Sequence, residues 1–396
     1  MRLTLDKTTS LPADAAQATL VGRIWLPGKI PGPAPVFIHG DDVIDISHTF
    51  PTLSELMAAA APAHSAREAS RAGRLVGKIG TSLANSAADT LDPGKPYFLA
   101  PCDLQPVKAC GVTFATSLLE RVIEEHARGN PAEAEEVRRN LRSEIGADLS
   151  RVEPGSREAI ELKRILLERG LWSQYLEVGI GPDAEVFTKA PPLASVGTGA
   201  EIGILARSSW NNPEPEVVAV VNPRGEIVGA TLGNDVNLRD FEGRSALLLG
   251  RSKENNASSA IGPFVRLFDE GFSIDDVRRM EVALTVEGDD QFALRGKSSM
   301  GEISRDPTDL VRQTLADNHD YPDGLLLYLG TMFAPTKDRD NPGEGFTHKL
   351  GDIVTISTPK LGALVNRVNH CDKIAPHRFG VAALMRNLAA RGLLQS

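Results

Sequence analysis

Short apolar runs, separated by turns rich in glycine and proline, make up much of the chain. Residues 19–25 and 34–39 predict two strands joined by a proline- and glycine-rich loop. Residues 216–222 and 226–231 flank the triplet Pro-Arg-Gly and predict a hairpin. Further strands are expected at residues 282–286, 325–329 and 353–358. This pattern indicates a sheet folded over on itself and not an alternation of parallel strands and helices.

Helical signals lie mainly between residues 52 and 170. Thr52 and Ser117 are each followed three positions later by glutamate, as in a capping box, so helices are expected to begin at both residues. Asn130-Pro131 predicts the start of another helix, which would end near Gly146. The charged residues of these helices are expected to form solvated faces.

A further helix is expected over residues 156–170, with Ile160, Ile165 and Leu166 towards the core. Residues 63–95 are small, polar and aperiodic, and are expected to belong to an accessory domain or its loops. The chain is therefore expected to have two parts, a small α/β accessory domain over residues 1–105 and a catalytic domain over residues 106–396. The fold class expected is α+β.

Composition excludes several classes of protein. Among 396 residues, 43 are basic and 52 acidic, so a net charge of −9 leaves no broad basic surface for nucleic acid. No apolar run reaches the roughly 18 residues of a membrane-spanning helix, and the first residues lack the apolar run of a signal peptide. Cys102, Cys110 and Cys371 do not form the pattern of a disulfide framework. We expect a cytoplasmic protein without nucleic-acid or membrane partners.

Three acidic residues carry the most informative chemistry. Glu214 and Glu216 enter an apolar strand two positions apart, so both carboxylates would project from one face. Asp235 ends the next strand of the hairpin and could join them across the sheet. Three carboxylates without histidine or cysteine select a hard cation, either Mg²⁺ or, as alternatives, Mn²⁺ or Ca²⁺. The plainer reading is an exposed acidic pair at the start of a strand.

The order of these residues resembles the fumarylacetoacetate hydrolase family. The resemblance extends from about Ala109 to about Val368 and rests on Glu214-x-Glu216, Asp235-x-x-x-Arg239, Lys253 and Gly330-Thr331. Longer strings at residues 172–177, 234–245 and 346–352 resemble the branch that contains the 2-keto-3-deoxy-D-pentonate (arabinonate or xylonate) dehydratases. The resemblance implies a mixed β-roll core with inserted helices, often dimeric, in which the three carboxylates bind Mg²⁺.

One departure from the family pattern bears on the reaction. Hydrolases of this family have a histidine and a glutamate that activate water, and the matching positions here are Ser117 and Glu120. A serine without a base of its own cannot activate water at neutral pH, which favours a lyase. The alternative remains that Ser117 and Glu120 form only a helix cap.

The resemblance also implies roles for other residues. Lys253 or Glu120 would act as the base or acid, next to Ser117. Arg239 and Thr331 would orient the carboxylate or oxo oxygens of the substrate. Lys189 would lie in a strand near the pocket.

The resemblance thus implies a metal-dependent dehydratase of oxidative pentose catabolism. It would convert a 2-keto-3-deoxy-D-pentonate, a small sugar acid, to 2-oxoglutarate semialdehyde (2,5-dioxopentanoate) and water, as a homodimer or higher homo-oligomer. One alternative is a hydrolase or decarboxylase of a β-diketo acid such as an acylpyruvate, which needs a water-activating base. Another is a non-catalytic domain that binds an oxo acid, in which a metal ligand would be missing.

Overall fold

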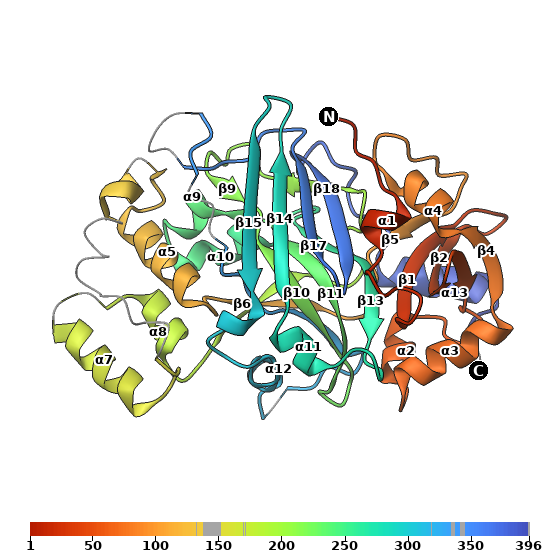
Figure 1. Ribbon diagram of the computed structural model, residues 1–396, viewed down its shortest axis with the longest axis horizontal. Coiled ribbons are helices and arrows are strands. Elements are labelled where there is room, and N and C mark those ends of the chain that lie inside the picture. The colour runs from red at the N-terminus through yellow and green to blue at the C-terminus, as the bar shows by residue number, and fades with distance from the viewer. Residues whose placement is uncertain are drawn as a thin grey trace.

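A computed structural model of the chain describes all residues except 132, 138–151, 169, 171, 318, 334–336, 341–344 and 395–396. In this part of the chain an eleven-stranded sheet has the order β4-β3-β2-β1-β13-β11-β10-β16-β6-β7, with β5 paired to β1. A five-stranded sheet has the order β15-β14-β17-β18-β8. Figure 1 shows the smaller sheet in front of β10 and β11 of the larger one.

The strands of the large sheet are β1 (Leu20–Leu26), β2 (Gly32–His39), β3 (Asp42–Asp45), β4 (Arg74–Lys78), β5 (Tyr97–Leu99), β6 (Val107–Gly111), β7 (Glu185–Ala190), β10 (Pro215–Val221), β11 (Ile227–Asp235), β13 (Ser259–Leu267) and β16 (Leu325–Tyr328). Those of the smaller sheet are β8 (Glu201–Ile204), β14 (Glu281–Glu287), β15 (Ala293–Ser299), β17 (Ile353–Thr358) and β18 (Gly362–His370). Two short strands, β9 (Asn211–Asn212) and β12 (Asn237–Leu238), pair with each other.

The helices lie around these sheets. They are α1 (Lys7–Ser10), α2 (Leu53–Ala58), α3 (Pro62–Ala72), α4 (Ile79–Ser86), α5 (Ala115–His126), α7 (Arg157–Glu168), α8 (Gln174–Ile180), α9 (Arg239–Glu242), α10 (Leu249–Lys253), α11 (Ile274–Arg278), α12 (Pro307–Leu315) and α13 (Val381–Ala390), with short 3₁₀ turns η2 (Ala246–Leu248) and η3 (Met300–Glu302). No helix in the described ranges is long and apolar enough to cross a membrane.

The main core lies between the two sheets. Strand β10 is buried along its whole length and is apolar from Val217 to Val221, as expected for a central strand covered on both faces. Val217 and Ala219 on one of its faces share a cluster with Val282 and Leu284 of β14. Strand β14 instead alternates buried and exposed residues, because only one of its faces meets the core. These two patterns explain why the smaller sheet forms the outer layer.

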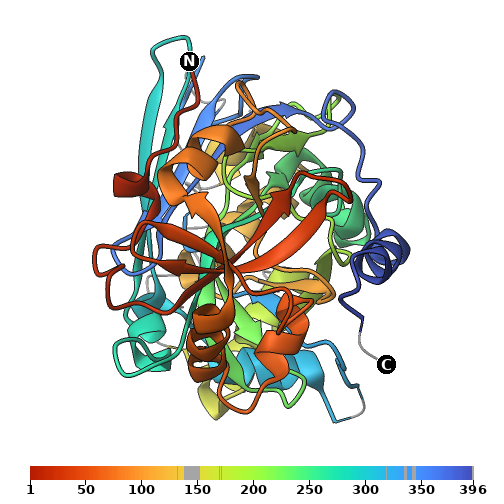
Figure 2. The ribbon, with the colours of Figure 1, turned by 90° about the vertical axis from the view of Figure 1, so that its right-hand side faces the viewer.

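The N-terminal part continues the large sheet. Strand β1 pairs antiparallel with β13, with Val21 opposite Val265. The apolar cluster beneath it includes Phe264 and Val365 from the second half of the chain. Figure 2 turns this end of the molecule towards the viewer. Whether residues 1–105 form a separate domain stays a prediction.

The predicted strands are confirmed, and the mixed sheets give the α+β architecture that was expected. Residues 63–95 contain most of α3 and all of β4 and α4, so they are not loops alone. Their membership of an accessory domain stays a prediction. Ile160 is 64% exposed on α7 and is not a core residue, whereas Leu166 is buried. The predicted end of the helix at Gly146 lies outside the described residues.

Candidate metal centre

Hairpin register brings the three predicted acidic residues together. Strands β10 and β11 pair antiparallel, with Glu216 opposite Gly233. The backbone N–H of Asp235 donates to the carbonyl oxygen of Glu214 at 3.1 Å. The last residue of β11 therefore lies beside the residues that begin β10.

Glu214, Glu216 and Asp235 form one buried cluster. Each offers a carboxylate oxygen, and these oxygens all lie within 4.8 Å of one another. The three residues are 4%, 2% and 1% exposed, so the reading as an exposed acidic pair is wrong. Carboxylates this close repel each other unless a cation lies between them. The all-oxygen set fits a hard divalent cation such as Mg²⁺.

A backbone donor holds the second carboxylate of the cluster. The N–H of Gly330 donates to Oε2 of Glu216 at 2.7 Å. Gly330 has a φ of +93°, in the left-handed region that favours glycine. A Cβ at this position would lie 1.9 Å from Oγ1 of Thr113. Only glycine can therefore place an N–H this close to Glu216.

Two buried lysines and one arginine balance the carboxylates. Lys189 Nζ lies 2.6 Å from Oδ1 of Asp235 and also donates to two backbone carbonyls. Lys253 Nζ lies 3.0 Å from Oδ2 of Asp235 and also bonds Glu214. Arg121 donates to the other oxygen of Glu214. Lys189 therefore lies behind Asp235 and holds it in place, and its predicted contact with substrate stays a prediction.

Burial and repulsion shift the protonation of the cluster. Burial raises the pKa of Glu216 well above its usual range, and the charges of Asp235 and Glu214 raise it further. Burial also raises the pKa of Glu214, against the opposing effect of Lys253. Burial acts in the same direction on Asp235, but Lys189 and Lys253 outweigh it and lower its pKa. Two of the three carboxyls thus resist ionisation until more positive charge is present.

A second layer of charges comes from α5 and α9. Arg239 Nη2 lies 2.6 Å from Oε1 of Glu124 and 3.5 Å from Oε2 of Glu120. The guanidinium of Arg239 also lies 4.1 Å from the centre of the Trp210 ring. Arg121 Nη1 lies 2.6 Å from Oε2 of Glu124. Glu124 is 1% exposed, so the predicted solvated face is wrong for this side of α5.

The first turn of α5 also differs from the prediction. Phe114 is the N-cap residue, and Ser117 lies inside the helix, where its hydroxyl donates to the carbonyl oxygen of Phe114 at 2.9 Å. Ser117 and Glu120 therefore do not form a capping box. The alternative that these two residues serve only as a cap is wrong.

A small cavity lies beside the cluster. Its volume is about 10 Å³, room for about one water molecule. It is lined by Ser117, Glu120, Arg121, Glu124, Asn212, Glu214, Arg239, Thr331 and Phe333. Four of the predicted catalytic and substrate-binding residues thus meet next to the carboxylate cluster. They are Ser117, Glu120, Arg239 and Thr331. A sugar acid needs more room, so side chains around this cavity must move to admit one.

The sequence reasoning missed three charged residues of this centre. Arg121 contacts Glu214 and Glu124, and its Nη1 also lies 3.2 Å from Oε2 of Glu242. Ser117, Arg121 and Glu124 are spaced at helical intervals on α5, so periodicity could have placed them on one face. Glu242 follows Arg239 in α9 and carries no comparable signal.

Comparisons with known proteins agree with this geometry. Residues 178–369 match the family model described as fumarylacetoacetate (FAA) hydrolase C-terminal. A probable 2-keto-3-deoxyxylonate dehydratase of Haloferax volcanii is 32% identical over 201 residues, 51% of this chain and 65% of the relative. A 2-dehydro-3-deoxy-D-arabinonate dehydratase of Saccharolobus solfataricus is 30% identical over 190 residues, 48% of this chain and 60% of the relative. The matches span less than two thirds of the length of either relative.

Solved structures show the same fold. A 2-keto-3-deoxy-D-arabinonate dehydratase, complexed with magnesium and 2,5-dioxopentanoate, superposes with a TM-score of 0.59 at 20% identity, covering 89% of this chain and 99% of that chain. The segment that matches the family model, residues 178–369, contains all three carboxylates of the buried cluster. Residues 178–369 of this chain are therefore similar to the fumarylacetoacetate hydrolase C-terminal family.

Proposed function

We propose that the protein is a Mg²⁺-dependent dehydratase that converts a 2-keto-3-deoxy-D-pentonate to 2,5-dioxopentanoate and water. The observation that carries the proposal is the buried cluster of Glu214, Glu216 and Asp235 beside a cavity lined by Glu120 and Arg239. The names of the two relatives and of the solved structure support this substrate class. By the family resemblance, we also propose a homodimer or higher homo-oligomer.

Glu214, Glu216 and Asp235 would hold the metal ion. When bound, the ion would stabilise the negative charge that develops on the ketone oxygen of the substrate as a C3 proton is removed. Arg239, between Glu120 and Glu124, is placed to pair with the substrate carboxylate.

Proton transfer is assigned to Lys253, which contacts the carboxylate cluster, and to Glu120, which lines the cavity. Burial lowers the pKa of Lys253, but Asp235 and Glu214 outweigh it and raise the pKa. We assign Lys253, in its ammonium form, the role of the acid that helps the C4 hydroxyl leave as water. Glu120 is then the base for the C3 proton. Loss of a C5 proton and return of a proton to C3 then give an enol, which becomes the aldehyde when C4 gains a proton and the C5 hydroxyl loses one.

The acylpyruvate hydrolase remains the second candidate. It would use the same carboxylate cluster, but it needs a base that activates water. Ser117 occupies the position of that base, and its hydroxyl is bonded to the carbonyl oxygen of Phe114. This contact favours the dehydratase. A non-catalytic oxo-acid binding domain is disfavoured because the carboxylate set is complete.

The test is to incubate the purified protein with Mg²⁺ and the D or the L enantiomer of 2-keto-3-deoxy-pentonate, and to follow 2,5-dioxopentanoate by NMR. We expect turnover that EDTA abolishes and Mg²⁺ restores. Acetylpyruvate should bind without being cleaved. Efficient cleavage of acetylpyruvate, without dehydration of the sugar acid, would replace this proposal with the hydrolase.

Glu216→Gln tests the cluster at nearly constant side-chain size. It removes one ligand charge, so turnover should fall by about a hundredfold or more, because the metal contributes several kcal/mol to such reactions. The matched control is Glu226→Gln in the turn of the same hairpin, where the carboxylate is 59% exposed. The control should keep wild-type activity. Near wild-type turnover of Glu216→Gln after Mg²⁺ repletion would contradict the assignment.

A further inference from the structure

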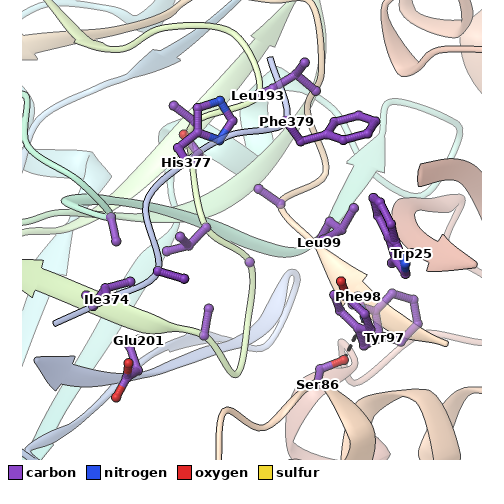
Figure 3. Close-up of a pocket in the computed structure, with 18 of the residues that line it drawn as sticks. Trp25, Ser86, Tyr97, Phe98, Leu99, Leu193, Glu201, Ile374, His377 and Phe379 are labelled. Atoms are coloured by element: carbon purple, nitrogen blue, oxygen red, sulfur yellow. Dashed lines mark hydrogen bonds between the residues drawn. The ribbon is translucent and has the colours of Figure 1, made fainter. Parts of the chain in front are cut away.

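A second cavity, much larger than the one beside the carboxylate cluster, lies away from that cluster. Its volume is about 640 Å³, within the range of small-molecule sites. It lies between the β1–β5 strand pair, the loop that contains Leu193, and the segment with His377 and Phe379 that leads to α13 (Figure 3). It shares no lining residue with the cavity beside the carboxylate cluster.

One wall of this cavity is aromatic. The rings of Trp25 and Tyr97 are nearly parallel, with centroids 6.3 Å apart and an interplanar angle of 21°. The ring of Phe379 meets Trp25 edge-on, with centroids 5.5 Å apart. All three rings border the cavity (Figure 3). This wall suits a flat apolar group.

Strand periodicity places a cation in the same wall. Arg23 and Trp25 are two positions apart on β1, so their side chains share one face of the sheet. Their partners across the β1–β5 pair are Leu99 and Tyr97, which also line the cavity. The guanidinium of Arg23 and the aromatic rings thus belong to one continuous surface.

Arg23 is buried without a direct ion-pair partner among the described residues. It is 6% exposed, it donates to the carbonyl oxygen of Cys102, and its Nε has no hydrogen-bond partner. Within the described residues it forms no ion pair of 4 Å or less. The nearby Asp103 carboxylate accepts instead from the backbone N–H groups of Leu53 and Ser54. An arginine cannot lose its proton, so a buried guanidinium without an anion is costly.

Another buried arginine shows the usual arrangement. Arg266 is 1% exposed, and its two Nη atoms lie 2.6 and 2.9 Å from the two carboxylate oxygens of Asp14. Arg23 lacks such a bidentate partner and borders an open cavity instead. The position that a carboxylate would take is therefore left to a ligand.

The remaining charged groups at the cavity also favour an anion. Arg378 and His377 border it beside Arg23. Glu201 is the carboxylate in the lining, and its Oε1 already accepts a hydrogen bond from Asn369 Nδ2 at 2.9 Å. The lining therefore carries more positive than negative charge.

We propose that this cavity binds a small carboxylate with an aromatic body. The carboxylate pairs with Arg23, and the ring packs against Trp25 and Tyr97. The site is independent of the proposed dehydration, because it uses none of the residues of the metal centre.

Isothermal titration calorimetry with 3-phenylpropionate and with its neutral amide, 3-phenylpropanamide, tests the proposal. The wild-type protein should bind the carboxylate about tenfold or more tightly than the amide, as expected for a charge-assisted pair. The affinity should be the same with Mg²⁺ and with EDTA, which separates this site from the metal centre. Equal affinity for the two probes, or no binding of the carboxylate, would overturn the proposal.

Arg23→Met tests whether Arg23 is the residue that binds the carboxylate of the probe. This variant should lose the preference for the carboxylate. Arg305→Met is the matched control, because Arg305 is 5% exposed and also donates only to backbone carbonyls, but borders no cavity of this kind. The control should bind as the wild type does. Unchanged selectivity in a folded Arg23→Met would overturn the proposal.

A second variant covers the case in which Arg23→Met does not fold. Ala375 is an exposed residue of the cavity lining, so Ala375→Trp fills the space without disturbing a strand. We expect binding of 3-phenylpropionate to be lost while the melting temperature stays unchanged. Retained wild-type affinity would show that the probe binds elsewhere, for example at an interface between two copies, and would reject this cavity.

Discussion

At the scale of single residues, Glu185 is a carboxyl whose ionisation opposes folding. It begins β7, and burial, assisted by repulsion from Glu242, raises its pKa from 4.5 to about 7. As the pH rises between these two values, the unfolded chain loses this proton while the folded chain keeps it. Stability therefore falls through this window, and the loss is complete above the folded pKa.

Glu185→Gln removes this penalty. Without metal, the variant should match the wild type at about pH 4 and gain up to about 3 kcal/mol at about pH 8, because each pKa unit corresponds to about 1.4 kcal/mol. Urea unfolding in EDTA at the two pH values measures the difference. Glu226→Gln should show no such gain, since hydrogen bonds from Asn222 and Arg224 lower the pKa of Glu226. A gain that is equal at both pH values would contradict the assignment to Glu185.

Part of the candidate site could be predicted from the sequence at this scale. Glu214 and Glu216 are two positions apart along an extended segment, and the hairpin turn fixes where Asp235 meets them. Local rules were therefore sufficient to predict that the three carboxylates lie together. The partners of Arg121 could not be predicted in this way. Glu214 and Glu242 lie 93 and 121 positions further along the chain, and only the packing of α5 against the hairpin and α9 brings them together.

At the scale of elements, the residue at which α5 begins decides whether Glu120 can be a helix-capping residue. Because α5 begins at Ala115 with Phe114 as N-cap, Glu120 contributes nothing to a capping box. Its carboxylate instead faces Arg239 across the cavity. A change at Glu120 therefore reports on the site and not on the end of the helix.

Glu120→Gln should reduce dehydration by about 10²–10⁴-fold, the usual contribution of a general acid or base. The melting temperature should change little, since glutamine keeps the size of the side chain. Glu125→Gln, on the same helix but outside the cavity lining, should keep full activity. Steady-state rates and thermal melts of both variants make the comparison. Full activity of Glu120→Gln would exclude Glu120 as the base.

Strands were easier to predict than the positions of helix ends. The continuous apolar run of β10 and the alternation in β14 follow directly from how many of their faces are covered. The start of α5 was misplaced because Ser117 and Glu120 fit a capping pattern that tertiary packing overrides. Ile160 was misplaced because the apolar residues of α7 allow more than one buried face, and contact with the rest of the molecule selects Ala159 and Leu166.

At the scale of the whole molecule, the N-terminal part covers the edge of a buried strand. All nine residues of β13 are buried, and β1 pairs with its C-terminal end at Val265 and Arg266. Without β1, the backbone of this end of β13 would lose its partner strand. Exposed apolar edges of this kind promote association between chains.

A chain limited to residues 106–396 tests the predicted domain division. We expect it to aggregate, as measured by size-exclusion chromatography with light scattering. Co-expression with residues 1–105 as a separate chain should restore solubility, because the missing strand is then supplied. A soluble, monodisperse fragment with native circular dichroism would instead establish the second part as an independent domain.

The lysines and the arginine around the carboxylate cluster have a consequence for how the proposed metal site would be filled. Lys189, Lys253 and Arg121 already pair with Asp235 and Glu214, so part of the negative charge of the cluster is balanced without a metal ion. In zinc fingers, by contrast, the ion itself makes folding favourable. Here the newly made chain can complete its fold before any metal ion arrives. Binding of the proposed metal ion would then displace lysine or arginine contacts within an already folded protein, and the ion bound would depend on what the cell supplies after synthesis.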